Sequence, residues 1–177
     1  MTESLSNELQ DLIEKQRIHD VLMRYCRGVD RVDRDLIASS FHSDGRCEFG
    51  SLLLEGASIG DTIAKAAGGC HLTTHMVGNE LAEIHGDVAL SELYFLSSSI
   101  VNGTQEGERQ LRMRAGRYVD RLERRDGKWK IKDRVVVEDW CKFHELPKLP
   151  EGVSFRAGQQ GAGDPLYVLL NSVKGLL

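Results

Sequence analysis

Helical periodicity and strand alternation occupy different halves of this sequence, and this segregation constrains the fold more than any other feature. Apolar residues recur at spacings of three and four from Leu9 to Val29, behind a possible cap at Ser6, which indicates one face of a long amphipathic helix. After Cys70 the segments have strand length and are separated by short turn signals. Because helices come first and strands follow, we expect an α+β protein, not an alternating βαβ chain.

Two shorter helices are predicted between the long helix and the strands. Gly28 suits the exit from the first helix. Asp33 or Asp35 can open a second helix that runs through Phe41, and residues 58–67 form a third that ends at a glycine pair. These helices are expected to lie against the sheet that follows them.

Four long strands are predicted after the helices, preceded by one short strand near residue 48. The strands are residues 73–84, 88–101, 109–124 and 128–143. Asn102-Gly103 and Asp126-Gly127 are strong signals for tight hairpin turns. A long helix, two short helices and a strongly bent antiparallel sheet make a cone, and such a cone is a natural small-molecule pocket.

Composition restricts the classes of function. The chain has 177 residues, 41% hydrophobic and 28% charged, which is typical of one soluble domain with a tail. The net charge of -4 and the absence of a basic block argue against a nucleic-acid partner. No apolar run reaches the roughly 20 residues of a membrane span. The N-terminus lacks a signal-peptide pattern and the four cysteines fit no zinc motif, so a reducing cytoplasm is expected.

Asp30 and His75 are the main candidates for chemistry, since each is a polar residue inside a largely apolar stretch. A carboxylate beside an imidazole orients the ring, fixes its tautomer and stabilises its protonated form. If the two residues meet in one pocket, they form a general-base unit. Each also fits a structural role, Asp30 as a turn aspartate and His75 as a core histidine.

No metal or cofactor is predicted. His71 and His75 are four residues apart, but in a strand this spacing spans about 13 Å, which is too far for one ion. No carboxylate or third histidine completes a ligand set. The glycine-rich motifs that bind dinucleotides or nucleoside triphosphates are also missing from the sequence.

Four segments, residues 18–31, 41–45, 71–75 and 126–131, together resemble SnoaL-like proteins of the nuclear-transport-factor-2-like superfamily. The resemblance implies a cone-shaped α+β barrel over residues 1–143, with N-terminal helices packed on a strongly bent, mostly antiparallel sheet. Residues 144–177 are then a C-terminal extension that packs on the cone or on a neighbouring subunit. The superfamily includes lyases, isomerases, dioxygenase small subunits and non-catalytic binders.

Within the superfamily, the pattern is most similar to the branch of scytalone dehydratase, hexachlorocyclohexane dehydrochlorinase and bile acid 7α-dehydratase. The resemblance implies that Asp30 and His75 form the dyad of that branch. Tyr25 matches a functional tyrosine of the bile acid enzyme, and Arg134 lies where that enzyme and the dehydrochlorinase have an active-site arginine. A second histidine and a second tyrosine of scytalone dehydratase have no clear counterpart, which argues against a scytalone-like substrate.

The residue pattern leaves Tyr25 and Arg134 open to structural interpretations. In a continuous helix the side chains of Tyr25 and Asp30 are about 140° apart, so both line one pocket only if the helix ends or kinks near Gly28. Arg134 is in phase with apolar and charged residues alike, and can belong to a charged strand face. A nearby arginine cluster is expected to face water or a partner subunit; its members are Arg109, Arg112, Arg114, Arg117 and Arg121.

The hypothesis for function is a cofactor-independent lyase, dehydratase-like, or an isomerase that acts on a small hydrophobic cyclic substrate such as a steroid, polyketide or aromatic catabolite. His75, oriented by Asp30, takes a proton next to a carbonyl, and Tyr25 or Arg134 stabilises the developing oxyanion. The alternatives are a non-catalytic small subunit resembling that of ring-hydroxylating dioxygenases, and a hydrophobic ligand-binding protein.

A homo-oligomer is also expected, with a trimer favoured over a dimer because the dehydratase relatives are commonly trimers. The predicted sheet has apolar positions around Val135 and Val137 that need cover. The apolar segment at residues 166–170 needs a surface as well, on its own cone or on a neighbour's.

Overall fold

The computed structural model describes residues 2–146 and 156–174. Its helices are α1 (Thr2–Arg31), α2 (Arg34–Ser39), α3 (Ala57–Gly68) and α4 (Pro165–Lys174), with a 3-10 turn, η1 (Gly161–Gly163). Its strands are β1 (Phe41–Phe49), β2 (Leu52–Glu55), β3 (Leu72–His85), β4 (Val88–Asn102), β5 (Arg109–Arg125) and β6 (Lys128–Glu145). The predicted α+β class, with helices before the main strands, is confirmed.

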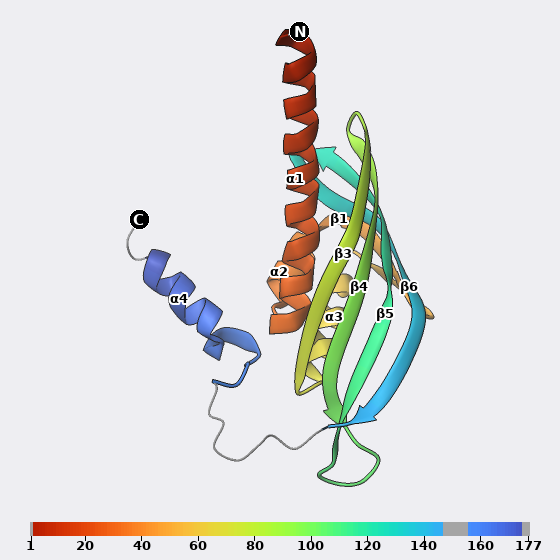
Figure 1. Cartoon of the computed structure of the whole chain (residues 1–177), viewed down its shortest axis with the longest axis vertical. Helices are drawn as coiled ribbons and strands as arrows, with labels where there is room; N and C mark the ends of the chain where they lie inside the picture. The colour runs from red at the N-terminus through yellow and green to blue at the C-terminus, as the bar shows by residue number, and fades with distance from the viewer. Residues whose placement is uncertain (1, 147–155, 175–177) are drawn as a thin grey trace.

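The strands form one six-stranded sheet in the order β2-β1-β6-β5-β4-β3. All neighbours are antiparallel except β1 and β6, which run parallel. The sheet is strongly bent, and α1, α2 and α3 lie on its concave side (Figure 1). It is therefore a mixed, open sheet that makes a cone with the helices, and it does not close into a complete barrel.

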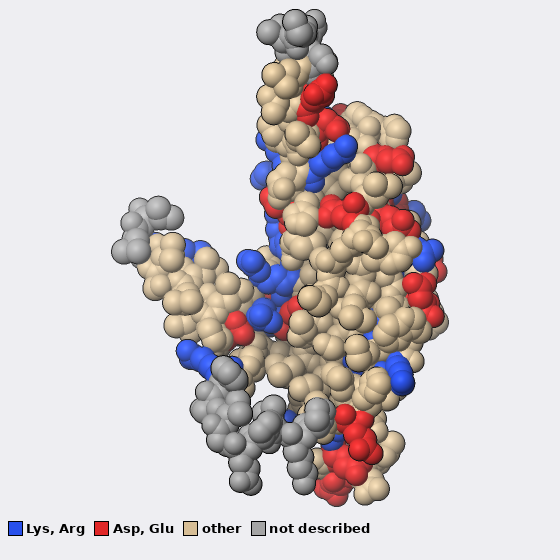
Figure 2. All heavy atoms as spheres, viewed as in Figure 1, with Lys and Arg blue, Asp and Glu red and all other residues tan. Residues whose placement is uncertain are grey.

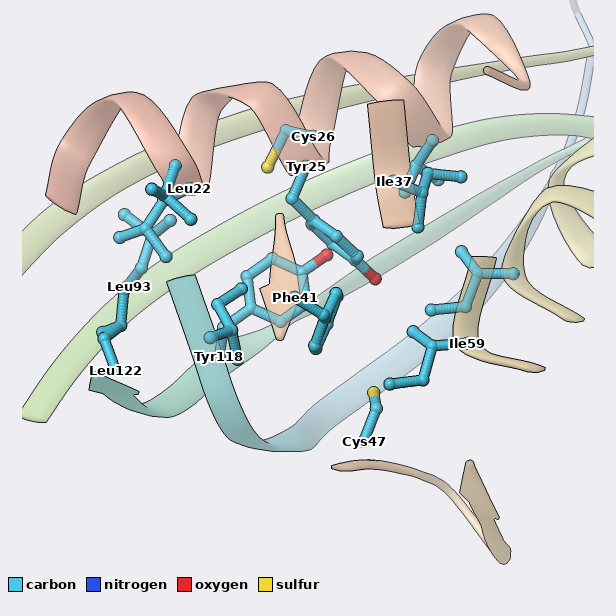
Figure 3. Packing of buried hydrophobic residues seen from close by; sticks show 14 of the residues in the cluster. Leu22, Tyr25, Cys26, Ile37, Phe41, Cys47, Ile59, Leu93, Tyr118 and Leu122 are labelled. Atoms are coloured by element: carbon cyan, nitrogen blue, oxygen red, sulfur yellow. The ribbon is translucent and has the colours of Figure 1, made fainter. Parts of the chain in front are cut away.

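The long helix α1 exists because its apolar residues repeat along one face, and that face is buried against the sheet. The core includes Ile18, Leu22 and Tyr25, and Tyr25 points from α1 toward Phe41 and Tyr118 (Figure 3). Two predicted helix boundaries are wrong. The helix begins at Thr2, so Ser6 lies inside it, and it continues past Gly28.

Gly28 has a packing role in place of the predicted exit. A Cβ atom at this position would lie 2.8 Å from Cγ1 of Ile37, so the glycine lets α2 approach α1 closely. The helix instead ends before Val32, whose φ is +54°. Asp33 then caps α2, accepting the backbone N–H of Leu36 at 2.9 Å, as predicted. Phe41 opens β1 and does not belong to the helix.

The two predicted hairpin turns behave differently. Asp126 and Gly127 have φ of +53° and +72° and connect β5 to β6 as a tight turn, which confirms that prediction. The turn at Asn102-Gly103 is wrong, because Asn102 pairs with Arg109 and residues 103–108 form a longer loop. That loop closes when the Gly103 N–H donates to the Glu108 carbonyl at 2.8 Å.

Irregularities in the β5–β6 ladder change which side chains of β6 face the helices. Leu122 pairs with Ile131, but Asp120 pairs with Arg134, so one extra residue of β6 lies between these pairs. Ile131 and Arg134 are consequently both buried, although they differ by three positions. A second shift occurs at Gly116, where a Cβ atom would lie 2.0 Å from the Val137 carbonyl oxygen. Only glycine fits at that point of the ladder.

The described part of the C-terminal extension runs past the ends of α3 and α1. Gln160 Nε2 donates to the carbonyl oxygens of Ala67 and Cys70 at 3.3 and 3.2 Å. The Tyr167 hydroxyl donates to Asp33 at 2.8 Å. The helix α4 then extends away from the cone (Figure 1) and presents a largely uncharged surface (Figure 2). Residues 147–155 and 175–177 of the predicted extension lie outside the described residues.

Candidate active site

Asp30 and His75 meet in the cone, as the sequence predicted. The last turn of α1 places Asp30 opposite the start of β3, and Asp30 Oδ1 lies 2.6 Å from Nδ1 of His75. The second carboxylate oxygen, Oδ2, accepts the backbone N–H of His75 at 3.0 Å. One carboxylate thus holds both the ring and the backbone of the same residue. The side chains of His75 and Asp30 are only 8% and 15% exposed.

This hydrogen bond determines which ring nitrogen can act as a base. An ionised carboxylate only accepts hydrogen bonds, so the hydrogen of the neutral ring lies on Nδ1 of His75. Nε2 then carries the free lone pair. Because Nδ1 is occupied by Asp30 and His75 lines a cavity, Nε2 is the atom left to meet a ligand.

The cavity beside His75 lies between the helices and the concave face of the sheet. It encloses about 560 Å³ of empty space with its open mouth included. The apolar part of its lining includes Val29, Phe49, Ile63, Phe95 and Val136. The polar part includes Thr73, Ser97, Ser99, Arg112 and Arg114.

Tyr25 lines the same cavity and is 2% exposed. Its ring packs edge-on against Tyr118, with centroids 5.5 Å apart. Burial raises the pKa of Tyr25 above its ordinary value, and the charge of Arg134 opposes this only in part. The tyrosine therefore keeps its proton and can donate a hydrogen bond. No kink in α1 is needed to bring Tyr25 to the site. Tyr25 lines the cavity directly, whereas Asp30 contacts His75, which lines the cavity.

Arg134 is fully buried, so its interpretation as part of a charged strand face is wrong. Its Nε and Nη2 donate to the two carboxylate oxygens of Asp120 at 2.7 and 2.6 Å. The guanidinium lies 4.1 and 4.2 Å from the ring centroids of Tyr25 and Tyr118. Burial lowers the pKa of Arg134, but Asp120 outweighs this and raises the pKa well above its ordinary value. Arg134 does not line the cavity itself and touches it through the two tyrosines.

Sequence reasoning missed Asp120, Tyr118 and two arginines of the cavity. Arg112 and Arg114 line the cavity, so the expectation that the whole arginine cluster faces water or a partner is wrong for these two. Alternate residues of β5 share one face, and Tyr118 and Leu122 on that face are apolar. That alternation was the available signal, because it places residues 112, 114 and 120 on the inner face.

The sequence also led us to expect neither a metal site nor a membrane span. Nε2 of His71 bonds Asn102 at 2.8 Å, away from the dyad. Among residues 2–146 and 156–174, no three histidines, cysteines or carboxylates are grouped in a way that could hold a metal ion. Within the same residues, no helix combines the length and the apolar character that crossing a membrane demands.

A bent sheet with three helices on its concave side and a cavity between the layers defines an α+β cone protein with an internal cavity. The sequence identifies the family to which this chain belongs. The chain belongs to the SnoaL-like domain family, whose sequence profile matches residues 10–135. A comparison with curated proteins found no match.

Solved structures of similar fold include a dehydrochlorinase and a putative scytalone dehydratase. A hexachlorocyclohexane dehydrochlorinase, LinA type 2, is 22% identical with a TM-score of 0.71, covering 82% of this chain and 99% of its own. A putative scytalone dehydratase from Novosphingobium aromaticivorans is 19% identical with a TM-score of 0.65, covering 88% and 100%. A putative aromatic ring hydroxylase from the same organism is 19% identical with a TM-score of 0.65, covering 76% and 94%. At these identities the likeness concerns the fold.

Proposed function

We propose that this chain is a cofactor-independent lyase of the dehydratase or dehydrochlorinase type, acting on a small cyclic substrate. The observation that carries the proposal is the Asp30–His75 pair, whose 2.6 Å hydrogen bond leaves Nε2 of His75 as a base beside the cavity. The similar folds of a dehydrochlorinase and a putative scytalone dehydratase support this class of reaction. Isomerisation begins with the same proton abstraction and is the nearest variant of the proposal.

In the proposed reaction, Nε2 of His75 takes a proton from a carbon of the substrate. The electron pair of that C–H bond forms a double bond to the neighbouring carbon, and the bond from this carbon to hydroxide or halide breaks. Asp30 stabilises the imidazolium that forms. When the leaving group is hydroxide, the imidazolium gives its proton to it and water is released. When the leaving group is halide, the halide departs as an anion and the imidazolium loses its proton to solvent water. Either route regenerates the ring nitrogen without a metal or nucleotide.

Tyr25 is proposed as the hydrogen-bond donor of the site. Its raised pKa keeps the hydroxyl protonated at neutral pH, so it can stabilise negative charge on a carbonyl oxygen or a leaving group. Arg134 is proposed as a positioning residue. It is held by Asp120 and lies against the rings of Tyr25 and Tyr118, which fixes the direction of the tyrosine hydroxyl.

The test of this function uses the purified chain alone, with a chelator present and no nucleotide added. The substrates are cyclic β-hydroxy ketones, with and without a carboxylate substituent, and hexachlorocyclohexane. Turnover is measured by absorbance of the new double bond and by chloride release. We expect turnover of at least one substrate class. Copurification with a larger iron-binding chain and no turnover would favour the small-subunit alternative. A trapped apolar ligand that is never converted would favour the carrier.

We also propose that the chain is a homo-oligomer, with a trimer favoured over a dimer. The outer face of the sheet exposes large apolar side chains, which include Met76, Leu90, Tyr94, Val135 and Trp140. On α4, Val168, Leu169, Leu170 and Val173 are exposed as well. Exposed apolar areas of this kind are typical of interfaces between subunits.

Light scattering is expected to give the mass of an oligomer for the full chain and a smaller mass, or a concentration-dependent one, for a chain that ends at residue 148. The reason is that the shortened chain keeps the apolar sheet face but loses α4. A monomeric full-length chain would contradict the assembly. An oligomer that is unchanged by the truncation would contradict a part for the C-terminal extension.

A reducing cytoplasm remains the proposed compartment. The four cysteines are free, and Cys141 is exposed while the other three are buried. Free thiols persist where the cell keeps them reduced, and an exposed thiol in an oxidising compartment is open to mixed disulfides.

A further inference from the structure

The polar wall of the cavity is built from two rows of side chains that cross three strands. Strand register places residues of β3, β4 and β5 directly opposite one another on the inner face of the sheet. The first row is His75, Ser97 and Arg114, and the second is Thr73, Ser99 and Arg112. All six residues line the cavity. The proposed base and two guanidinium groups therefore share one wall.

The two arginines of this wall differ in their charge partners. Arg114 donates from Nε to Glu138, which balances its charge. Arg112 has no carboxylate partner among the described residues, and its only hydrogen bond there runs from Nη2 to Sγ of Cys70 at 3.5 Å. Its Nε is buried without a partner. A guanidinium has five N–H donors, and leaving buried donors unpaired costs free energy.

Two other arginines of β5 differ from Arg112 in having carboxylate partners. Arg117 pairs with Glu92 and Asp139, at 3.0 and 3.4 Å. Arg121 pairs with Glu123 and Asp133, at 2.6 and 3.2 Å. These arginines lie outside the cavity and their charges are balanced by the protein. Arg112 faces the cavity and its charge is left for a ligand to balance.

The hydroxyl groups next to Arg112 complete an acceptor-binding site. Oγ1 of Thr73 and Oγ of Ser99 are 3.3 Å apart, and both residues are less than 9% exposed. Ser99 lies directly opposite Arg112 in the ladder. Hydroxyl and guanidinium donors together match the two oxygens of a carboxylate, which the planar fork of arginine binds in a bidentate manner.

We infer that the substrate of this chain carries a carboxylate group, which binds Arg112 with help from Thr73 and Ser99. The inference rests on the proposed function and specifies its substrate class. Arg112 is two strands across and two residues along from His75, so their Cα atoms are about 12 Å apart. Because both side chains line the cavity, we place one ring of the substrate between the carboxylate and the carbon that meets Nε2.

A single carboxylate fits the charge of the site better than a dianion. Glu138 already balances Arg114, so one uncompensated positive charge remains on this wall. The substrate is therefore a cyclic monocarboxylate whose apolar ring lies against Phe95 and Val136. Its reacting carbon lies toward His75 and its carboxylate lies toward the second polar row.

Binding measurements test the inference independently of turnover. The probes are benzoate and cyclohexanecarboxylate, each compared with its neutral amide by calorimetry on the unmodified chain and on Arg112→Gln. We expect the carboxylates to bind more tightly than the amides, and Arg112→Gln to weaken carboxylate binding by about 10- to 100-fold. The amides should bind the two proteins equally. Arg121→Gln is the matched control, since it removes a guanidinium from the same strand outside the cavity, and it should leave both probes unaffected.

The outcomes separate this inference from the proposed function. Equal binding of acid and amide, unchanged binding in Arg112→Gln, or no binding of either acid at millimolar concentration would overturn it. Carboxylate binding that depends on Arg112, combined with no turnover of any substrate, would support the inference while the lyase proposal fails. Arg112→Lys is a second variant in case Arg112→Gln misfolds. Lysine keeps the positive charge but lacks the planar guanidinium group, so we expect carboxylate affinity between that of the unmodified chain and that of Arg112→Gln.

Discussion

His75→Ala is expected to lower turnover by about 10²- to 10⁴-fold, because it removes the base that takes the substrate proton. His75 is almost buried at the cavity wall, and Nδ1 is held by Asp30. The alanine variant should stay folded, since the ring borders a cavity on one side. Initial rates with a substrate found in the elimination assay, together with thermal unfolding, measure both effects. His71→Ala is the matched control, because His71 is exposed and its side chain bonds only Asn102 among the described residues.

Asp30→Asn tests the tautomer argument within the same dyad. The amide keeps the shape of the carboxylate but loses its charge, so it cannot stabilise the imidazolium. If its NH2 group turns toward Nδ1, the ring hydrogen moves to Nε2 and the base is lost. Turnover should therefore fall by about 10²-fold or more. Near-normal rates in both His75→Ala and Asp30→Asn would exclude the mechanism and leave the pair a structural role.

The dyad was predictable because its parts lie where regular elements end or begin. Asp30 falls in the last turn of a helix whose apolar face is clear from the sequence, and His75 lies near the start of β3, whose residues alternate in burial. Resemblance to the SnoaL-like pattern then paired two residues 45 positions apart. Alternation alone could not have done so, since it fixes the face of a residue but not its partner.

The surroundings of Arg134 were not predictable, because a ladder irregularity changes the phase of β6. Residues 129 and 131 are buried, and after the shift residues 134 and 136 take over the inner face. Strict alternation that is counted from one end of β6 therefore assigns the wrong face to the residues beyond the irregularity. Arg112 was missed for a different reason. The arginine-rich part of β5 was interpreted as a solvated face, although Tyr118 and Leu122 set the phase of this strand.

Asp120→Ala is expected to lower the free energy of unfolding by about 3–5 kcal/mol. This is the largest loss of stability that we expect from a single substitution. Asp120 and Arg134 are both fully buried and form two hydrogen bonds. Removing the carboxylate leaves a guanidinium in the core, and arginine does not discharge at accessible pH. For a chain of this size the midpoint of thermal unfolding should fall by roughly 6–20 °C. Asp133→Ala is the control, because Asp133 pairs with arginines at the surface, where ion pairs contribute about 0–1 kcal/mol.

The reverse substitution and the double variant show how the pair works. Arg134→Met leaves the carboxyl group of Asp120 buried without a partner. Because a buried carboxyl can take up a proton, the destabilisation caused by this substitution should become smaller as the pH is lowered. Asp120→Leu with Arg134→Met should recover much of the stability, since apolar replacement of a whole buried pair is often neutral. If Arg134 positions Tyr25, the double variant stays folded yet turns over more slowly, with kcat reduced more than KM is raised. Full activity in a stable double variant would assign the pair to folding alone, and an unchanged midpoint in Asp120→Ala would contradict the buried ion pair itself.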